Sequence, residues 1–481
     1  MMKKITYLLL GIISTVGIVS CSLEDNIDPK NASNVPVETL FTSAQVEFVN
    51  QYNSMSVNRN ISRLLAQYWM ETTYTNESRY DFLDRGISDS FSSEFYKDVI
   101  KDLREAMKIL DAAGFEGALA EKAVNQKATM TILEVYSFTI LAETFGDIPY
   151  SEAALEIPDF TPKYDDAETV YADLLVRLNA AIASLDEDKG TWGHEDLLFD
   201  GDIAKWKMLG NALKLRMGMR MADVPSFNSA TVVTEALAAG VYDANLEGAF
   251  FKYIGSDPHV NTIYDGFVVD GRKDYTPSNT LIDKMVALDD PRLPLWFTTV
   301  NGEYKGIEYG KEDGGVYDQF SHFTDMFFEP TLEAVLADYS EMEFFLAEAV
   351  ERGYAVGGTA EEHYNNGVTA SILYYGGTEA AAAAYLAQPN VAYATAAGDW
   401  KEKIGTQKWL AMYNRGVEGW AEWRRLDFPI LNVPAGMEYS DIPVRYPYPF
   451  DENEMNEENY DAASAAIGGD KATTKLWFDK F

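Results

Sequence analysis

The residues best suited to bind a ligand are aromatic and lie in two polar segments. A sugar ring has an apolar C–H face and a hydroxyl rim, so a site for it needs tyrosine or tryptophan rings with amide or guanidinium groups at their edges. The candidate ligand-binding residues are Tyr74, Asn76, Arg79 and Tyr80 in the first segment, and Tyr264, Arg272 and Tyr275 in the second. Ordinary packing within a loop is the alternative role for each of them.

Motifs for catalysis and for metal binding are not found in the sequence. No G-x-S-x-G, H-E-x-x-H, P-loop or dinucleotide-binding pattern occurs, and no loop has the spacing of a calcium site. The histidines, His194, His259, His322 and His363, are scattered, whereas a zinc site needs paired ligands. We therefore expect no enzyme activity, no metal and no cofactor. A surface glycosidase or peptidase is the alternative, because 76 acidic residues could hide a catalytic pair.

The composition is typical of a folded and strongly acidic protein. The chain has 481 residues, of which 47% are hydrophobic and 13% aromatic, and its formal net charge is −37. A disordered chain this acidic would be poor in aromatic residues. Phosphate backbones would be repelled by this charge, so nucleic acid is excluded as a partner. A well-solvated extracellular surface accounts for the acidity.

The N-terminus predicts a lipoprotein leader. Lys3 and Lys4 precede a mostly apolar run over residues 5–19, and residues 18–21, IVSC, resemble a bacterial lipobox. Cys21 is the only cysteine, which leaves either a free or catalytic thiol or an acylated N-terminus, and its position favours an acyl anchor such as palmitate. We expect residues 1–20 to be a signal peptide and residues 21–36 a tether. No other apolar run approaches the ~20 residues of a membrane span.

Residues 127–155 predict the helix around which the other elements are arranged. Apolar side chains lie on more than one side of it, which is typical of a buried helix. We expect this helix to end at Gly146, with Pro149 preventing its resumption.

Helical spacing also predicts elements on both sides of this helix. Helices are expected over residues 40–70, 91–113, 171–185, 203–217, 399–413 and 417–426, with a loop over 72–82. The expected helix caps are Asp165 with Glu168, Ser340 with Glu343, and Thr359 with Glu362. Basic side chains surround the helix over 203–217, where pairing with acids at the helix surface is the expected role and an anion site the alternative. These are Lys205, Lys207, Lys214, Arg216 and Arg220.

Residues 241–329 interrupt the helical pattern. Glycine, proline and aspartate become frequent there, which predicts an irregular insertion between helical halves. Within it, residues 293–310 predict a β-hairpin that turns on Asn301 and Gly302. Long irregular segments on a rigid scaffold often carry binding residues.

Several motifs together resemble the SusD/RagB family of nutrient-binding outer-membrane lipoproteins. They are GDIPYSEA, GDIAKWKMLGNALKLRMGMR, FFLAEAVERGY, TQKWLAMYNRGVEGWAEWRRLDFP and IPVRYPYP, in the order of that family. The acidic residues after Cys21, in SLEDN, also resemble the export signal of surface lipoproteins. Helix packing and buried ion pairs are the expected roles of several residues in these motifs, namely Trp420, Trp423, Arg424, Arg425, Arg445 and Tyr446.

The resemblance implies a fold, a partner and a place for the ligand. The expected fold is mostly α, a right-handed α-α superhelical array with tetratricopeptide-like hairpins, and residues 37–481 would form a single domain. The implied partner is a SusC-type TonB-dependent transporter, to which a lipid-anchored protein on the cell exterior delivers a nutrient. In the family, the aromatic platform for glycans comes from an early loop and the middle irregular region. Oligosaccharide is the expected cargo and peptide is the alternative.

Overall fold

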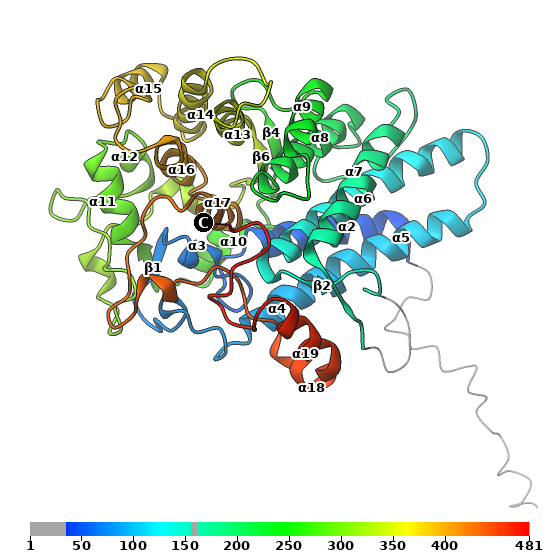
Figure 1. Ribbon diagram of the computed structural model, residues 1–481, viewed down its shortest axis with the longest axis horizontal. Helices are drawn as coiled ribbons and strands as arrows, with labels where there is room; N and C mark the ends of the chain where they lie inside the picture. Colours follow the sequence, from blue (N-terminus) through cyan, green and yellow to red (C-terminus); the bar gives the residue numbers. More distant parts are fainter. Residues whose placement is uncertain (1–34, 155–160, 481) are drawn as a thin grey trace, which may run out of the picture.

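A long buried helix, α6 (Ala118–Phe145), lies at the centre of the helical half of the chain (Figure 1). The computed structural model describes residues 35–154 and 161–480. Almost every α6 residue from Ala128 to Phe145 is buried, because α5, α7 and α8 pack around it. The helix ends at Gly146, whose φ of 90° is rare for other residues, so the predicted end is confirmed. It begins earlier than predicted, after Gly117.

The elements before the middle insertion are mainly paired helices. They are α2 (Val37–Tyr52), α3 (Ser62–Leu65), β1 (Trp69–Glu71), α4 (Ile87–Ser93), a π-helix (Glu94–Ile100), α5 (Lys101–Ala112), α6, β2 (Ile148–Pro149), β3 (Tyr164–Asp165), α7 (Ala167–Ser184), α8 (Ile203–Arg220) and α9 (Ser229–Ala239). Helix α2 packs on α5, α6 on α7, and α8 on α9. The prediction of a mostly helical fold built from hairpins is confirmed.

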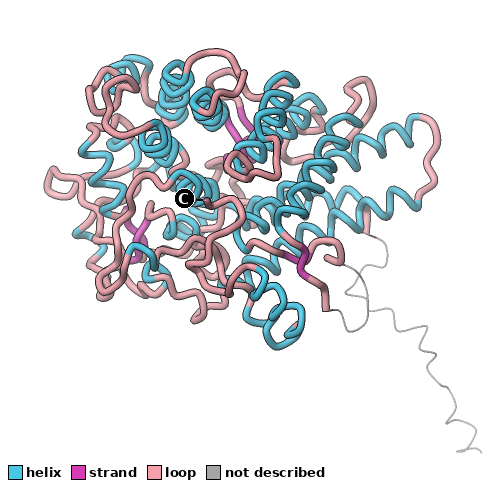
Figure 2. Tube along the Cα trace, viewed as in Figure 1, coloured by secondary structure: helices cyan, strands magenta, loops and turns pink. Residues whose placement is uncertain are grey.

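The middle segment is irregular, and paired helices return after it. Its elements are β4 (Gly248–Phe251), α10 (Thr262–Tyr264), a π-helix (Asp265–Val269), β5 (Tyr275–Pro277), α11 (Asn279–Ala287), α12 (Leu293–Trp296) and β6 (Ala334–Asp338). The later helices are α13 (Tyr339–Glu351), α14 (Ala360–Tyr374), α15 (Glu379–Leu386), α16 (Trp400–Ala411), α17 (Gly416–Leu426), α18 (Phe450–Met455) and α19 (Glu457–Ala466). In Figure 2 the loops gather on the side of the molecule that carries β1.

The described residues form three short antiparallel strand pairs, two of which join distant parts of the chain. Strand β4 pairs with β6 from Gly248↔Asp338 to Phe251↔Ala334, so the middle segment leaves and rejoins the helices at one place. Strand β1 pairs with β5 and ties that segment to the early loop. Strands β2 and β3 pair beside the end of α6.

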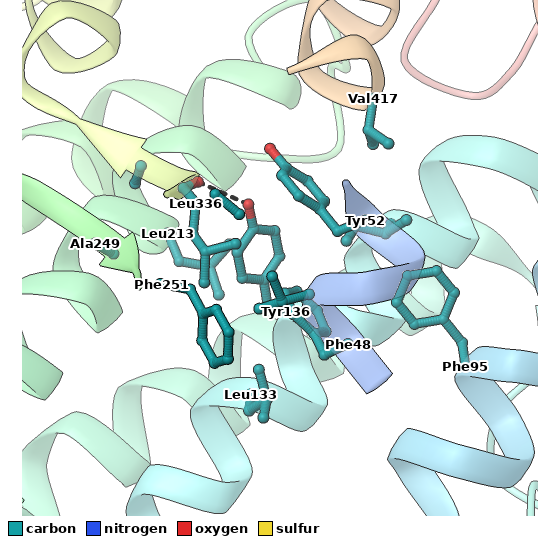
Figure 3. Close-up of a cluster of buried hydrophobic side chains, with 14 of the residues drawn as sticks. Phe48, Tyr52, Phe95, Leu133, Tyr136, Leu213, Ala249, Phe251, Leu336 and Val417 are labelled. Carbon is teal, nitrogen blue, oxygen red and sulfur yellow. Dashed lines mark hydrogen bonds between the residues drawn. The ribbon is translucent and has the colours of Figure 1, made fainter. Parts of the chain in front are cut away.

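The hydrophobic core runs from the first helices through α6 into the second half. Figure 3 shows Phe48 and Tyr52 of α2 packed beside Tyr136 of α6, with Phe95 of the π-helix on the far side. The hydroxyl of Tyr136 donates a hydrogen bond to the carbonyl of Leu336, at 2.8 Å, and so links α6 to β6. The two halves of the chain therefore share this packing.

Buried ion pairs join α6, α8, α13 and α17. Arg216 Nε lies 2.7 Å from Glu341 Oε1, and Arg220 Nε lies 2.9 Å from Glu143 Oε2. Both arginines also contact Glu418, at 3.0 and 2.6 Å. The prediction that these basic residues pair with acids is right, but its placement of Arg216 and Arg220 at the surface is wrong. Other elements cover the side of α8 that carries Arg216 and Arg220, so both guanidinium groups are buried. Their positive charges are compensated by the buried carboxylates that they contact.

The motif residues near the C-terminus are also structural. Trp420, Trp423, Arg424, Arg425, Arg445 and Tyr446 are all buried. Arg445 donates two hydrogen bonds to the carbonyl of Phe145, at 3.1 and 2.9 Å, and pairs with Asp470 at 2.5 Å. The guanidinium group thereby satisfies a carbonyl at the end of α6 that has no helical partner.

Several predicted boundaries are wrong for local reasons. Residues 40–70 are not one helix, because α2 ends at Tyr52 and a turn, α3 and β1 follow. Helix α7 is capped by Asp166 instead of Asp165, which belongs to β3. Helix α13 is capped by Asp338 instead of Ser340, whose hydroxyl donates to the carbonyl of Gly367. The capping box of Thr359 and Glu362 is confirmed.

The predicted hairpin forms only its turn. Asn301 and Gly302 have φ of 56° and 83°, and a bridge joins Val300 to Glu303 around them. The first predicted strand is instead helical in α12, and Phe297 bridges to Phe323. Phe297 therefore pairs with Phe323 and not with a second strand of the predicted hairpin.

Candidate functional site

The first predicted segment forms an exposed loop after β1. Tyr74 is 75% exposed and has φ of 57°, so its ring stands out from the surface. Asn76 is exposed and donates to Asp84 Oδ2 at 2.6 Å, while Arg79 donates to the carbonyl of Gly310 at 2.8 Å. Tyr80 is half-buried, and its hydroxyl accepts a hydrogen bond from Gln67. This loop offers one free ring with polar groups around it.

The second predicted segment contains a mixture of surface and core residues. Arg272 is half-buried and pairs with Asp274 at 3.0 Å. Tyr264 is half-buried at the end of α10. Tyr275 is only 2% exposed, because β5 turns its ring inward against Trp69, with ring centroids 5.7 Å apart. Tyr275 therefore does not present a ring face to a ligand, contrary to the prediction.

The structure brings these two segments together through β1 and β5. Glu71 pairs with Tyr275 in the strand register. Directly after it, the amide of Thr72 donates to the carbonyl of Asp274, at 2.7 Å, and its hydroxyl donates to the carbonyl of Lys273, at 2.9 Å. The early loop and the middle segment therefore form one surface.

A third segment, which the sequence did not single out, completes this surface. The amide of Gly315 donates to the carbonyl of Thr72, at 2.9 Å, and Thr75 donates to the carbonyl of Glu312, at 2.7 Å. Gly314 has φ of 58°, and a Cβ there would lie 2.0 Å from the carbonyl oxygen of Thr72. Only glycine allows this close approach of the two backbones. We call residues 72–80, 264–275 and 310–322 together the loop surface.

The third segment adds a stacked pair of rings. Tyr317 and His322 lie with ring centroids 4.0 Å apart and an interplanar angle of 14°. His322 Nε2 also lies 3.1 Å from the carbonyl oxygen of Tyr317, and nearby Val316 is largely exposed. The signal in the sequence was an aromatic cluster in an irregular segment, but the stack exists only after the chain turns back on itself.

A pair of buried carboxyl groups supports the first loop from below. Glu71 Oε2 accepts hydrogen bonds from the amide of Ser78, at 2.9 Å, and from its hydroxyl, at 3.0 Å. Glu77 is buried beside it and pairs with Arg85 at 2.5 Å. Burial, followed by the charge of Glu77, raises the pKa of Glu71 to about 9. Glu71 therefore stays protonated at neutral pH and holds the loop as a neutral hydrogen-bonding group.

The chemistry available at the loop surface is binding. It offers ring faces, a guanidinium group and amides, which suit the face and rim of a sugar. Within residues 35–154 and 161–480 no cluster of three or more His, Cys, Asp or Glu side chains is arranged to hold a metal ion. None of the helices in those same ranges has the length and apolar character that crossing a membrane requires.

Comparison with known proteins identifies relatives of this architecture. The SusD-like family, described as "Starch-binding associating with outer membrane", matches residues 29–449. A solved chitin-binding protein is 28% identical and superposes with a TM-score of 0.79, covering 93% of this chain and 100% of its own. A chitin-binding SusD homologue from Flavobacterium johnsoniae is 24% identical, with a TM-score of 0.77 and coverages of 92% and 98%. A SusD homologue from Bacteroides ovatus is 25% identical, with a TM-score of 0.74 and the same coverages. The search of curated proteins found no match.

Proposed function

The chain belongs to the SusD-like family, and on this premise we propose that it binds an oligosaccharide at the outer membrane and passes it, intact, to a SusC-type TonB-dependent transporter. The loop surface is the proposed binding site. The observation that carries this proposal is the meeting of three separate loops around Tyr74, whose ring is 75% exposed on a rigid base of strand pairing. An exposed tyrosine held in this way gives a sugar ring a flat face at little entropic cost.

Chito-oligosaccharide is the ligand that we propose first. The support is that a chitin-binding protein matches the whole fold at 28% identity. A pyranose ring would stack on Tyr74, and its substituents would reach the amide of Asn76 and the guanidinium groups of Arg79 and Arg272. Arg272 keeps 39% of its side chain exposed while it pairs with Asp274, so part of its guanidinium group is available.

Isothermal titration of the full chain in detergent with chitotriose to chitohexaose tests the proposal. Saturable binding with recovery of the intact sugar is the expected result. Recovery of shorter products would instead identify a glycosidase, and cleavage of a casein peptide mixture would identify a peptidase. Binding of peptides without any binding of saccharides would change the proposed cargo.

Attachment and delivery are further parts of the proposal. Cys21 lies outside the described residues, and we propose that it carries the lipid anchor that holds the protein on the exterior face of the outer membrane. Replacement of Cys21 by serine is then expected to move the protein from the membrane fraction to the soluble fraction. Crosslinking in the native host, followed by mass spectrometry, is expected to recover a TonB-dependent transporter with the wild-type protein.

A further inference from the structure

A cavity of about 740 Å³ lies on a different part of the molecule from the loop surface. It is bordered by α4 and the following π-helix, the β2–β3 pair, and α18. In Figure 1 the labels of α4, β2 and α18 lie near one another in the lower middle of the molecule. Its volume is within the range of small-molecule binding sites. Three tyrosines line it, Tyr96, Tyr164 and Tyr448, and we call it the tyrosine cavity.

The walls of this cavity combine apolar faces with a fixed polar edge. Ile148, Pro149 and the tyrosine rings supply the apolar faces. At the edge, Glu452 accepts a hydrogen bond from the hydroxyl of Tyr164, at 3.2 Å, and from Asn456 Nδ2, at 2.9 Å. These groups are held in place by the protein and retain further capacity to accept hydrogen bonds.

Tyr448 is the most deeply buried of the three tyrosines. Its ring is only 4% exposed, and its hydroxyl is buried without a hydrogen-bond partner among the described residues. The ring is fixed by the guanidinium group of Arg445, 4.5 Å from its centroid, and by the edge of Tyr164, at 4.9 Å. Tyr448 therefore gives the cavity a rigid ring face, and a ligand does not reach its hydroxyl.

The charges around the cavity favour a neutral ligand. Lys97 and Lys101 lie at the cavity, and so do Asp89 and Asp451. The amide of Asp451 donates to Asp89 Oδ1 at 2.9 Å, which ties α18 to α4. Because both signs of charge are present, neither a strongly anionic nor a strongly cationic ligand is favoured, whereas ring faces with a polar edge suit an uncharged sugar.

The local backbone supports a binding role for the tyrosine cavity. Tyr96 and Lys97 belong to the π-helix that interrupts the run from α4 to α5. The other π-helix of the described chain, Asp265–Val269, belongs to the loop surface. Such segments widen a helix locally and are frequent at functional sites.

We propose that the tyrosine cavity is a second binding site, for a short neutral oligosaccharide, separate from the loop surface. Sugar rings pack against the rings of Tyr96, Tyr164 and Tyr448, and sugar hydroxyls reach Glu452 and Asn456. The ligand class is taken from the proposed function, on which this inference rests. The place of the site is taken from the cavity alone.

One variant of the cavity and one control test the inference by titration of the full chain with chitotriose and maltotriose. Ser93→Trp places a large ring in the cavity from α4 and is expected to abolish the second site. Tyr448→Phe is the control, because it removes only a hydroxyl that a ligand does not reach, so the melting temperature and the affinity at both sites are expected to hold.

The outcomes separate this inference from the proposed function. The wild type is expected to show two saccharide sites. Loss of one site in Tyr74→Ala and of the other in Ser93→Trp would support both the loop surface and the tyrosine cavity as binding sites. A single site that is lost in Tyr74→Ala and unchanged in Ser93→Trp overturns the tyrosine cavity and leaves the proposed function intact. A single site lost only in Ser93→Trp supports the cavity and overturns the loop surface.

Discussion

The amide of Thr72 donates a hydrogen bond to the carbonyl of Asp274, at 2.7 Å, and this bond joins two loops that are far apart in the chain. It extends the pairing of β1 with β5 by one step beyond Glu71 and Tyr275. The exposed ring of Tyr74 is therefore placed relative to the middle segment by backbone contacts, which do not depend on side-chain identity.

Tyr74→Ala and Tyr275→Ala are expected to have opposite effects. Tyr74 is exposed, so its loss should weaken saccharide binding at the loop surface about tenfold and leave the melting temperature unchanged. Tyr275 is buried against Trp69, so its loss should lower the free energy of unfolding by about 3 kcal/mol. Titration calorimetry and urea unfolding measure the two effects. A stable Tyr74→Ala variant with unchanged affinity at every site would exclude this ring from binding.

Gly314→Ala is expected to separate the first and third loops. Its Cβ would lie 2.0 Å from the carbonyl oxygen of Thr72, in addition to the strain of a φ of 58°. Gly302→Ala is the control, since Gly302 has φ of 83° but nothing within 4 Å of its Cβ position. We expect Gly302→Ala to cost about 1 kcal/mol of stability and Gly314→Ala to cost more and to weaken saccharide binding. Equal behaviour of the two variants in unfolding and titration would contradict the proposed role of this contact.

Glu71 is expected to make stability fall as pH rises. Burial and Glu77 raise its pKa from 4.5 to about 9, so between these values the folded protein holds a proton that the unfolded chain releases. This contribution is complete below pH 4.5 and is lost as pH rises through about 9. The charged groups that interact with Glu71 are Glu77 and Arg85, and the neutral phenols of Tyr275 and Tyr309 also lie near it.

Glu71→Gln keeps a neutral acceptor for Ser78 and is expected to remove this dependence. Urea unfolding at pH 5, 7 and 9 is the measurement, and Glu303→Gln, on an exposed side chain, is the control. A Glu71→Gln profile that stays parallel to the wild type would show that Glu71 is already ionised in the folded protein.

Glu348 is expected to make stability fall in acid. Burial alone would raise its pKa, but Arg425 and Arg352 outweigh burial and lower the pKa from 4.5 to about 2. A depressed pKa contributes stability above pH 4.5 that is lost as pH falls toward 2, by roughly 3 kcal/mol for this group. Arg425→Met should reduce stability at pH 7 by about 3 kcal/mol and flatten the acid limb, whereas Arg59→Met, in an exposed pair, should change little. Calorimetric melting from pH 7 to 3 measures both.

Local patterns predicted the features that depend on local chemistry. The end of α6 at Gly146 and the capping box of Thr359 were predictable, because a glycine with positive φ and a reciprocal side-chain bond act within a few residues. The family resemblance rested on motifs that are buried in the structure, such as Arg445 at the end of α6. These residues preserve the fold, which is why they identify the family and not the ligand.

Long-range contacts account for what the sequence did not reveal. Tyr275 looked like a loop tyrosine, but the pairing of β5 with β1 places it in the core. Ser340 was predicted as a helix cap, but β6 pairs with β4 up to Asp338, and Asp338 caps the helix that follows. The tyrosine cavity brings together residues from separate segments, so no local pattern marked it. Tyr317 and His322 belong to one segment, but their stack depends on how the chain turns between them.

The pairing of β4 with β6 has a consequence for how such proteins diversify. Because the middle segment departs and returns through neighbouring strands, its length and sequence can change while the two ends keep their positions. Related proteins could therefore differ in this segment while they keep the same helical scaffold. Replacing the middle segment would change the loops at the surface, while the helices on either side of it remain the same.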